Sequence, residues 1–262
     1  MEEKEVKKLL SEAKKKRNYG EFAEALAILH HVNNEFSQNA TYRYLLASTY
    51  YESMNIEAAK QYTEEAIQLD RAYKENHELM GDIFEKEVNL EKAKEFYEKA
   101  YELDHQYLTV IEKLIQLYLK IKNFEGVVKM CDNMMSLIPV DTSTAKSRAL
   151  TSIYLGCILY KGWALVYLKQ YENAISQIEE IKVMDKKTGL PNYPGMYKNE
   201  DESLFKLYYK LKNSEKAEEF RTLLANEYKY SKEDVRKLEA EADQDIILFR
   251  QRPEVMLQLG LS

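Results

Sequence analysis

The sequence predicts an all-α fold in which paired helices stack on one another, and three observations lead to this class. The 262 residues include only 8 Gly and 4 Pro, whereas the helix formers Ala, Leu, Glu and Lys are plentiful. Similar residues recur at intervals of 34 positions along the first half of the chain. Within each interval the apolar residues follow the three- and four-residue spacing of amphipathic helices.

The internal repeat consists of seven columns of similar residues in one register. A period of this length is typical of solenoid proteins, in which each unit buries its apolar surface against its neighbours. The clearest columns, each in chain order, are Ala25, Ala59, Ala93 and Val127; Val32, Ala66, Ala100 and Met134; Ala13, Ala47, Gly81 and Ile115; and Tyr50, Phe84 and Tyr118.

Each period is interpreted as two helices joined by a tight turn. Small residues such as Ala47 and Gly81 are expected where two helix backbones approach closely, and the aromatic column fills the seam beside them. A column of asparagines marks the turn, because Asn tolerates left-handed backbone geometry and bonds to the local backbone. Its members are Asn55, Asn89 and Asn123.

The segment Glu91–Asp104, preceded by Gly81 and Phe84, resembles the tetratricopeptide repeat. Pro139 falls where that repeat usually closes with a proline. The resemblance implies a right-handed α-solenoid of helix-turn-helix hairpins that forms a single domain over residues 1–262. Its repeats are placed at residues 6–39, 40–73, 74–107, 108–141, 155–188 and 198–231.

Two insertions separate the last repeats from the first four. Residues 142–154 are compatible with a helix and are expected to extend or precede the first helix of the fifth repeat. Residues 185–198 include two prolines and two glycines, which break helices on both sides and predict a loop.

The chain is expected to close with a capping helix at about 231–250. Ser231 and Asp234 resemble an N-cap pair, and one apolar stripe follows them. This helix would cover the open face of the last repeat. The tail 251–262 is apolar at Pro253 and beyond, and it either folds back on the last repeat or docks into another copy or a partner. The apolar stripe of the capping helix consists of Val235, Leu238, Ala242, Ile246 and Phe249.

Composition narrows the classes of function. A net charge of −6 argues against a general nucleic-acid binder, which needs a positive surface. No long uncharged apolar stretch predicts a membrane span, and the charged N-terminus does not resemble a secretory signal. Cys131 and Cys157 lie in apolar surroundings and are expected to be buried free thiols. A cytoplasmic protein is the expectation.

The sequence contains no motif that predicts catalysis, so no catalytic residue, cofactor or metal is expected. Glycine-rich phosphate loops and zinc-binding patterns are both absent. His30 and His31 are adjacent on one helix, so their side chains point about 100° apart and cannot share a metal. The basic run Lys14–Arg17 either complements the dipole at a helix C-terminus or contacts an anionic partner.

In proteins of the family that the chain resembles, the first helices of the repeats line a concave groove that grips peptides or helices. In this sequence the third repeat would supply acids to that groove, and the first would supply Lys7, Leu10, Lys14 and Arg17. The candidate partner-binding residues are Tyr44, Ser48, Tyr51, Glu75, Glu78, Asp82, Glu85, Glu112, Gln116, Trp163, Tyr167, Lys206 and Tyr209.

The hypothesis is that the groove binds a peptide or helix with cationic character near the third repeat and apolar side chains near Trp163 and Tyr167. Alternatively, the acids keep the groove solvated and Trp163 packs in the core. One subgroup of the family grips acidic chaperone C-termini with a clamp of Lys, Asn and Arg. Leu10 and Lys14 occupy the positions of its first Lys and Asn, so that partner class is not expected.

The function predicted from the sequence is a non-catalytic scaffold or adaptor for another protein, acting as a monomer or weak homodimer. A chaperone-like or regulatory subunit that shields a client protein is the first alternative. An enzyme with an unrecognised site at the 185–198 loop is the second, although that loop contains no histidine.

Overall fold

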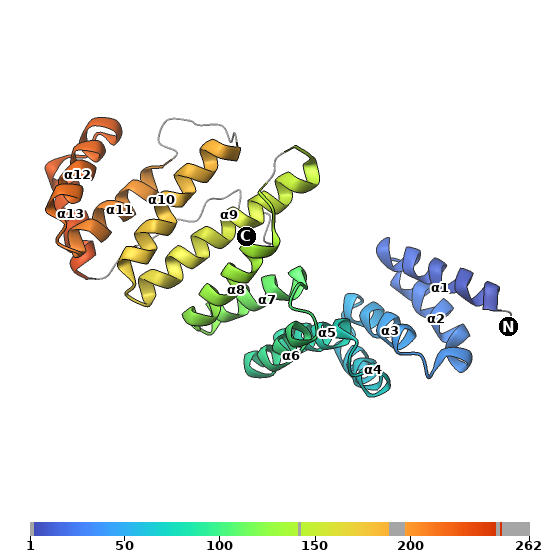
Figure 1. Ribbon diagram of the computed structural model, residues 1–262. Coiled ribbons are helices and arrows are strands. Elements are labelled where there is room, and N and C mark those ends of the chain that lie inside the picture. Colours follow the sequence, from blue (N-terminus) through green and yellow to red (C-terminus); the bar gives the residue numbers. More distant parts are fainter. Residues whose placement is uncertain (1–2, 141–142, 189–196, 245–246, 248–262) are drawn as a thin grey trace. The chain divides into compact units, whose positions relative to one another are not determined.

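A computed structural model describes residues 3–140, 143–188, 197–244 and 247 of the chain. Within these residues it contains thirteen helices and no strand (Figure 1). The chain divides into two compact units, residues 1–117 and 118–262. The all-α solenoid class is therefore confirmed, whereas the single domain over the whole chain stays a prediction.

The first unit consists of helical hairpins in the predicted register. The boundaries of the second and third repeats coincide with the starts of α3 and α5. The helices of this unit are α1 (Glu3–Asn18), α2 (Phe22–Phe36), α3 (Ala40–Glu52), α4 (Ile56–Leu69), α5 (Lys74–Lys86), α6 (Leu90–Leu103) and the part of α7 (Leu108–Lys120) that ends at Leu117.

The second unit contains the two displaced hairpins and a final helix. Residues 145–154 extend α9, which decides between the two expectations for the first insertion. Part of the second insertion, 189–196, lies outside the described residues, but α10 includes 185–188. The helices are α8 (Phe124–Leu137), α9 (Ala145–Tyr167), α10 (Tyr171–Thr188), α11 (Lys198–Lys210), α12 (Ser214–Tyr228) and α13 (Lys232–Asp243).

The final helix is shorter than the sequence predicts. Ser231 caps it in a capping box with Asp234, as expected, and the buried residues of the stripe pack with α11 and α12. The helix ends at Asp243 rather than near 250, and Ile247 is buried in the same core. The tail 251–262 lies outside the described residues, as do Ile246 and Phe249 of the predicted stripe.

Helix α9 is the one described helix whose length and composition would allow it to span a membrane. It contains Lys161, whose amino group lies 2.6 Å from the Asp132 carboxylate of α8. A 61% share of the segment Ala149–Tyr167 is buried inside the protein. Both features are those of a core helix. The two cysteines are buried and free as predicted, and burial raises the pKa of Cys131.

The turns within the hairpins correct one prediction. Each asparagine of the turn column is the N-cap of the second helix, where its side chain accepts a hydrogen bond from a backbone N–H three residues on. The left-handed residue is the one before it, with φ between 57° and 65°. The asparagines therefore cap the second helices, and the residues before them, Met54, Val88 and Lys122, adopt the strained left-handed conformation.

Replacing Val88 with glycine should stabilise the first unit by about 0.5–1 kcal/mol. Val88 has φ 58° and is 78% exposed, so glycine relieves backbone strain without losing packing. Urea unfolding followed by circular dichroism measures the change. The matched reversal is Gly20→Ala at φ 78°, where a new Cβ meets no atom within 4 Å, and it should destabilise the unit. Unchanged stability in both variants would contradict the strain.

Gly81 has a different role from the predicted one. A Cβ at this position would lie 2.4 Å from two ring carbons of Tyr97, so the atoms nearest to it belong to an aromatic side chain of α6. The Tyr97 side chain is fully buried. Glycine is therefore required at position 81, because a larger residue would leave no room for the Tyr97 ring.

Candidate partner-binding face

The first helices of the hairpins in the first unit form one connected surface, which we call the first-helix face. Arg17 of α1 donates from Nη1 to Ser48 Oγ of α3 over 2.7 Å. The Tyr44 ring of α3 meets the Tyr73 ring, at the N-cap of α5, edge to face with centroids 5.6 Å apart. Lys113 of α7 then reaches back to α5. The face thus runs in the order α1, α3, α5, α7.

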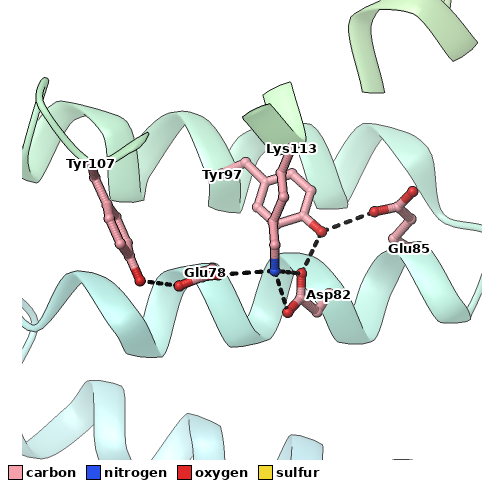
Figure 2. Close-up of polar contacts among 6 residues, drawn as sticks. All are labelled: Glu78, Asp82, Glu85, Tyr97, Tyr107 and Lys113. Atoms are coloured by element: carbon pink, nitrogen blue, oxygen red, sulfur yellow. Dashed lines mark hydrogen bonds and ion pairs between the residues drawn. The ribbon is translucent and has the colours of Figure 1, made fainter. Parts of the chain in front are cut away.

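Lys113 lies at the centre of the acidic part of this face (Figure 2). Its Nζ donates to Asp82 Oδ1 and Oδ2 over 2.5 and 2.6 Å, and it lies 2.9 Å from Glu78 Oε1. The same ammonium group is 5.7 Å from the centroid of the Tyr97 ring. One internal cation therefore joins α5 to α7 and offsets part of the acidic charge.

Two tyrosines also contact the acids of α5, as Figure 2 shows. The Tyr97 hydroxyl lies 2.6 Å from Asp82 Oδ1 and 2.9 Å from Glu85 Oε2. A phenol has one proton to donate, so the two carboxylates share it. Tyr107 donates to Glu78. The acids of α5 are therefore held in place by α6, by Tyr107 just before α7 and by α7 itself.

Burial governs the protonation of the groups in this network. It raises the pKa of Asp82, and Lys113 and Tyr97 offset only part of that rise. Burial alone would lower the pKa of Lys113, but the carboxylates of Asp82 and Glu78 outweigh it and leave the pKa raised. Burial and the adjacent acids also raise the pKa of Tyr97 and Tyr107. At neutral pH the ammonium is charged and both phenols are neutral.

Most of the predicted residues of the first unit lie on or beside this face. Tyr44, Tyr51, Glu75 and Glu112 are partly exposed and are available to a partner. Burial raises the pKa of Glu112. Ser48 is only 5% exposed and holds Arg17, so it supports the face rather than lining it. Glu78, Asp82 and Glu85 are engaged by the internal network, and Gln116 is partly buried on α7.

The predicted residues of the second unit have two different environments. Tyr167 is 53% exposed, stacks on Phe124 with centroids 4.4 Å apart, and meets Trp163 edge to face. Lys206 was predicted to line the groove, but it is 3% exposed and its amino group is 2.5 Å from Glu241 of α13. The capping helix α13 covers Lys206, so this residue stabilises the packing of the fold and does not line a groove. Tyr209 is partly buried beside Phe205.

Sequence reasoning missed Lys113 and the supporting tyrosines Tyr97 and Tyr107. A signal for the lysine exists, because Lys113 and Asp82 are 31 positions apart, as are Arg17 and Ser48. A separation of 31 is one repeat less about one helical turn, which places two side chains opposite each other on neighbouring first helices. Opposite charges at this separation indicate an internal pair.

The family model for the C-terminal ARM domain of tetratricopeptide repeat protein 21 matches residues 13–147, which are 135 of the 262 residues. The chain belongs to this tetratricopeptide repeat family. The match includes all of α2 to α8 and therefore most of the first-helix face. A comparison with curated protein sequences gives no match.

Solved structures of tetratricopeptide repeat proteins share the fold. MamA is similar with a TM-score of 0.57 at 16% identity, over 72% of this chain and 98% of its own. YrrB has a TM-score of 0.55 at 16% identity, over 82% and 97%. PilF of Pseudomonas aeruginosa has a TM-score of 0.50 at 15% identity, over 90% and 97%. At these identities the likeness establishes the fold alone.

Among the residues that the structure describes, no group of three or more His, Cys, Asp or Glu side chains is arranged to hold a metal ion. The acids of α5 are instead arranged around an ammonium group. The chemistry that this arrangement supports is the binding of cationic and hydrogen-bonding groups.

Proposed function

We propose that this repeat protein is a non-catalytic scaffold that holds a polypeptide segment of a partner protein on its first-helix face. One observation carries the proposal. Three consecutive first helices contribute partly exposed side chains to one surface, and Lys113 already fixes the centre of that surface. These side chains are Tyr44 and Tyr51 of α3, Glu75 of α5 and Glu112 of α7. Such a surface loses little side-chain entropy when a partner binds.

The aromatic side chains would supply most of the affinity. Tyrosine combines a large apolar ring with a polar tip and is enriched among the residues that dominate protein interfaces. Burial is the main cause of the raised pKa of Tyr44 and Tyr51, so both rings are already partly desolvated before a partner arrives. YrrB is described as a tetratricopeptide repeat protein with an unusual peptide-binding site, so this fold is compatible with peptide binding.

The charge of the face favours a partner segment with Lys or Arg side chains. Five carboxylates of α5 and α7, Glu75, Glu78, Asp82, Glu85 and Glu112, lie on or beside the face. The ammonium of Lys113 contacts Glu78 and Asp82, and that of Lys74 lies near Glu75 and Glu78 but pairs with Asp104, so the charge is −6 + 2 = −4 when all of these groups are ionised. Opposite charge would steer the encounter and select the partner. In the second unit, the exposed Tyr167 is proposed as a separate contact for apolar side chains of a partner.

The test starts with selection of phage-displayed random peptides on the full-length protein. Peptides that are enriched should bind the Glu75→Gln/Glu112→Gln variant about 10-fold more weakly, because roughly 0.7 kcal/mol is lost with each charge. Fluorescence anisotropy of labelled peptides measures the dissociation constants. Neutralising these two acids leaves the Lys113 network intact, so the fold is not at risk.

The matched control is Glu57→Gln/Glu91→Gln, which removes the same charge from exposed positions in the first turns of the second helices α4 and α6. This control should bind the peptides as the native protein does. Equal weakening in both variants would mean that only net charge matters, and the absence of any enriched peptide would argue against a peptide-binding face.

A further inference from the structure

We infer that the first-helix face contains a subsite for one arginine side chain of the partner segment. Its walls are the rings of Tyr44, Tyr73 and Tyr107, and its anionic group is the Glu75 carboxylate. This inference rests on the proposed function and names the side chain that the face selects. Three features of the first unit carry it: the arrangement of the rings, the unused polar groups and the charge.

The three tyrosines come from three different segments of the first unit. Tyr44 lies on α3, Tyr73 is the N-cap residue of α5, and Tyr107 directly precedes α7. The rings of the first two meet edge to face with centroids 5.6 Å apart. The Tyr107 hydroxyl donates to Glu78, which lies one turn beyond Glu75 on the same stripe of α5 (Figure 2). All three rings are partly exposed, so they meet at the start of α5 and remain accessible.

The Glu75 carboxylate lies close to all three tyrosines. Burial is the largest cause of the raised pKa of Tyr73, and the charge of Glu75 is the next. For Tyr44 and Tyr107, Glu75 adds to the effects of burial and of Glu78 on the pKa. Because the effect of a charge falls with distance, one carboxylate that acts on three phenols must lie near each of them. This agrees with the ring contact and the hydrogen bond that join the same residues.

Three polar groups of this cluster are unused inside the protein. The Glu75 carboxylate and the hydroxyls of Tyr44 and Tyr73 form neither a hydrogen bond nor an ion pair with any residue that the structure describes. Glu75 differs in this respect from Glu78, which the Tyr107 hydroxyl and the ammonium group of the network engage. The cluster therefore offers three hydrogen-bond acceptors beside aromatic rings to a ligand that donates several hydrogen bonds.

The cations that border the cluster have counterions of their own. The Lys74 ammonium lies 2.5 Å from Asp104 Oδ2, and it also lies 4.4 Å from the centroid of the Tyr107 ring. The Nε of Arg17 lies 3.7 Å from a carboxylate of α3. Neither cation forms an ion pair with Glu75, so this carboxylate keeps its charge for a ligand. The contact between Lys74 and the Tyr107 ring also shows that a ring of the cluster accepts a cation against its face.

Arginine matches these groups better than lysine does. Its guanidinium group is planar, stacks on aromatic rings and presents five N–H donors in a fork that fits a carboxylate. Two of these donors would bind Glu75, and the others would reach the hydroxyls of Tyr44 and Tyr73. Lysine offers three donors on a compact, strongly hydrated ammonium group that cannot stack as a plane. The subsite therefore selects a cation by its shape as well as by its charge.

The experiment uses the Nα-acetyl amides of arginine, lysine and citrulline as probes, because each presents a side chain without the rest of a partner. They are titrated into the full-length protein at constant ionic strength, and NMR records the ring signals of ¹³C-labelled tyrosines. The arginine probe should shift the signals of Tyr44 and Tyr73 with a dissociation constant at least about 5-fold below that of the lysine probe. The citrulline probe, which is uncharged and of similar shape, should bind too weakly to measure.

Variants assign the probe to the subsite. Glu75→Gln should weaken binding of the arginine probe at least about 5-fold, because the bidentate ion pair is lost. Tyr44→Phe removes a single hydroxyl and should weaken binding about 3-fold. The matched controls are Glu91→Gln, at an exposed position of α6, and Tyr62→Phe, at a partly exposed position of α4. Both controls should bind the arginine probe as the native protein does.

Two results would overturn the inference and leave the proposed function standing. Equal binding of the arginine and lysine probes, with the same dependence on Glu75, would mean that the face recognises charge alone. If the arginine probe shifts none of these tyrosine signals while peptides selected by phage display still bind, the partner is held by another part of the face. The proposed function fails on a separate result, which is the absence of any selected peptide that binds.

Discussion

Replacing Asp201 with alanine should destabilise the second unit by about 3 kcal/mol. Asp201 is 2% exposed on α11, where it accepts hydrogen bonds from Lys182 of α10 and, over 2.7 Å, from the Tyr228 hydroxyl of α12. The Lys182 ammonium also lies over the Tyr197 and Phe220 rings, 5.4 and 5.6 Å from their centroids. Removing the carboxylate leaves this partly buried cation without its counterion, which is the costly way to break an ion pair.

Hydrogen exchange resolved by residue measures the loss where it occurs. Amides in α10, α11 and α12 should exchange about 100-fold faster, whereas those of α3 to α6 should be unaffected, because repeats couple chiefly to their neighbours. Glu227→Ala, at an exposed position of α12, is the control for loss of a carboxylate.

A double variant tests whether the missing counterion is the cause of the loss. Asp201→Leu/Lys182→Met replaces both charges with apolar groups of similar size, and it should recover much of the stability. Equal losses in the single and double variants would instead show that packing around α11 matters and the charge does not.

Replacing Gly81 with alanine should destabilise the first unit by about 2 kcal/mol, although alanine is the better helix former by about 1 kcal/mol. The new methyl group would lie 2.4 Å from the Tyr97 ring carbons. The ring cannot move aside easily, because it is fully buried and its hydroxyl is bound by Asp82 and Glu85. Overpacking of this kind costs up to about 3 kcal/mol. Urea unfolding measures the change.

A double-mutant cycle tests the mechanism of this loss. One repeat earlier the equivalent positions are Ala47 and Thr63, since 81 − 34 = 47 and 97 − 34 = 63, so a larger residue in the first helix accompanies a smaller one in the second. In the Tyr97→Thr background, Gly81→Ala should cost nothing or stabilise, which gives a coupling energy of about 2 kcal/mol or more. The same loss in both backgrounds would refute the steric account.

The helices and their register could be predicted because they depend on local sequence. The third repeat was placed at 74–107, and α5 begins at Lys74. The periodic apolar positions decide this, since a helix that turned another face inward would bury charge. The turn was also located correctly, but not its left-handed residue. Met54 and Val88 carry no sign of that conformation, because closure of the hairpin imposes it.

The candidate site could be predicted only as a stripe of side chains. The pattern placed Tyr44, Tyr51 and Glu75 on the first helices, where they are found. It could not show that Lys113 lies between Glu78 and Asp82, because that contact depends on how far α7 is displaced along α5. Lys206 matched the groove pattern equally well, but α13 covers it.

The amino-acid sequence by itself determined the helical class, the positions of the hairpins and the residues that each first helix displays. The tertiary structure alone decided which of those residues are engaged inside the protein and which are left for a partner. The physical reason is the difference in how far apart along the chain the interacting residues lie. Burial of an apolar stripe is specified within a single helix by the spacing of its residues, whereas an ion pair such as Lys113 with Asp82 joins two helices whose relative offset is set by the packing of every side chain between them.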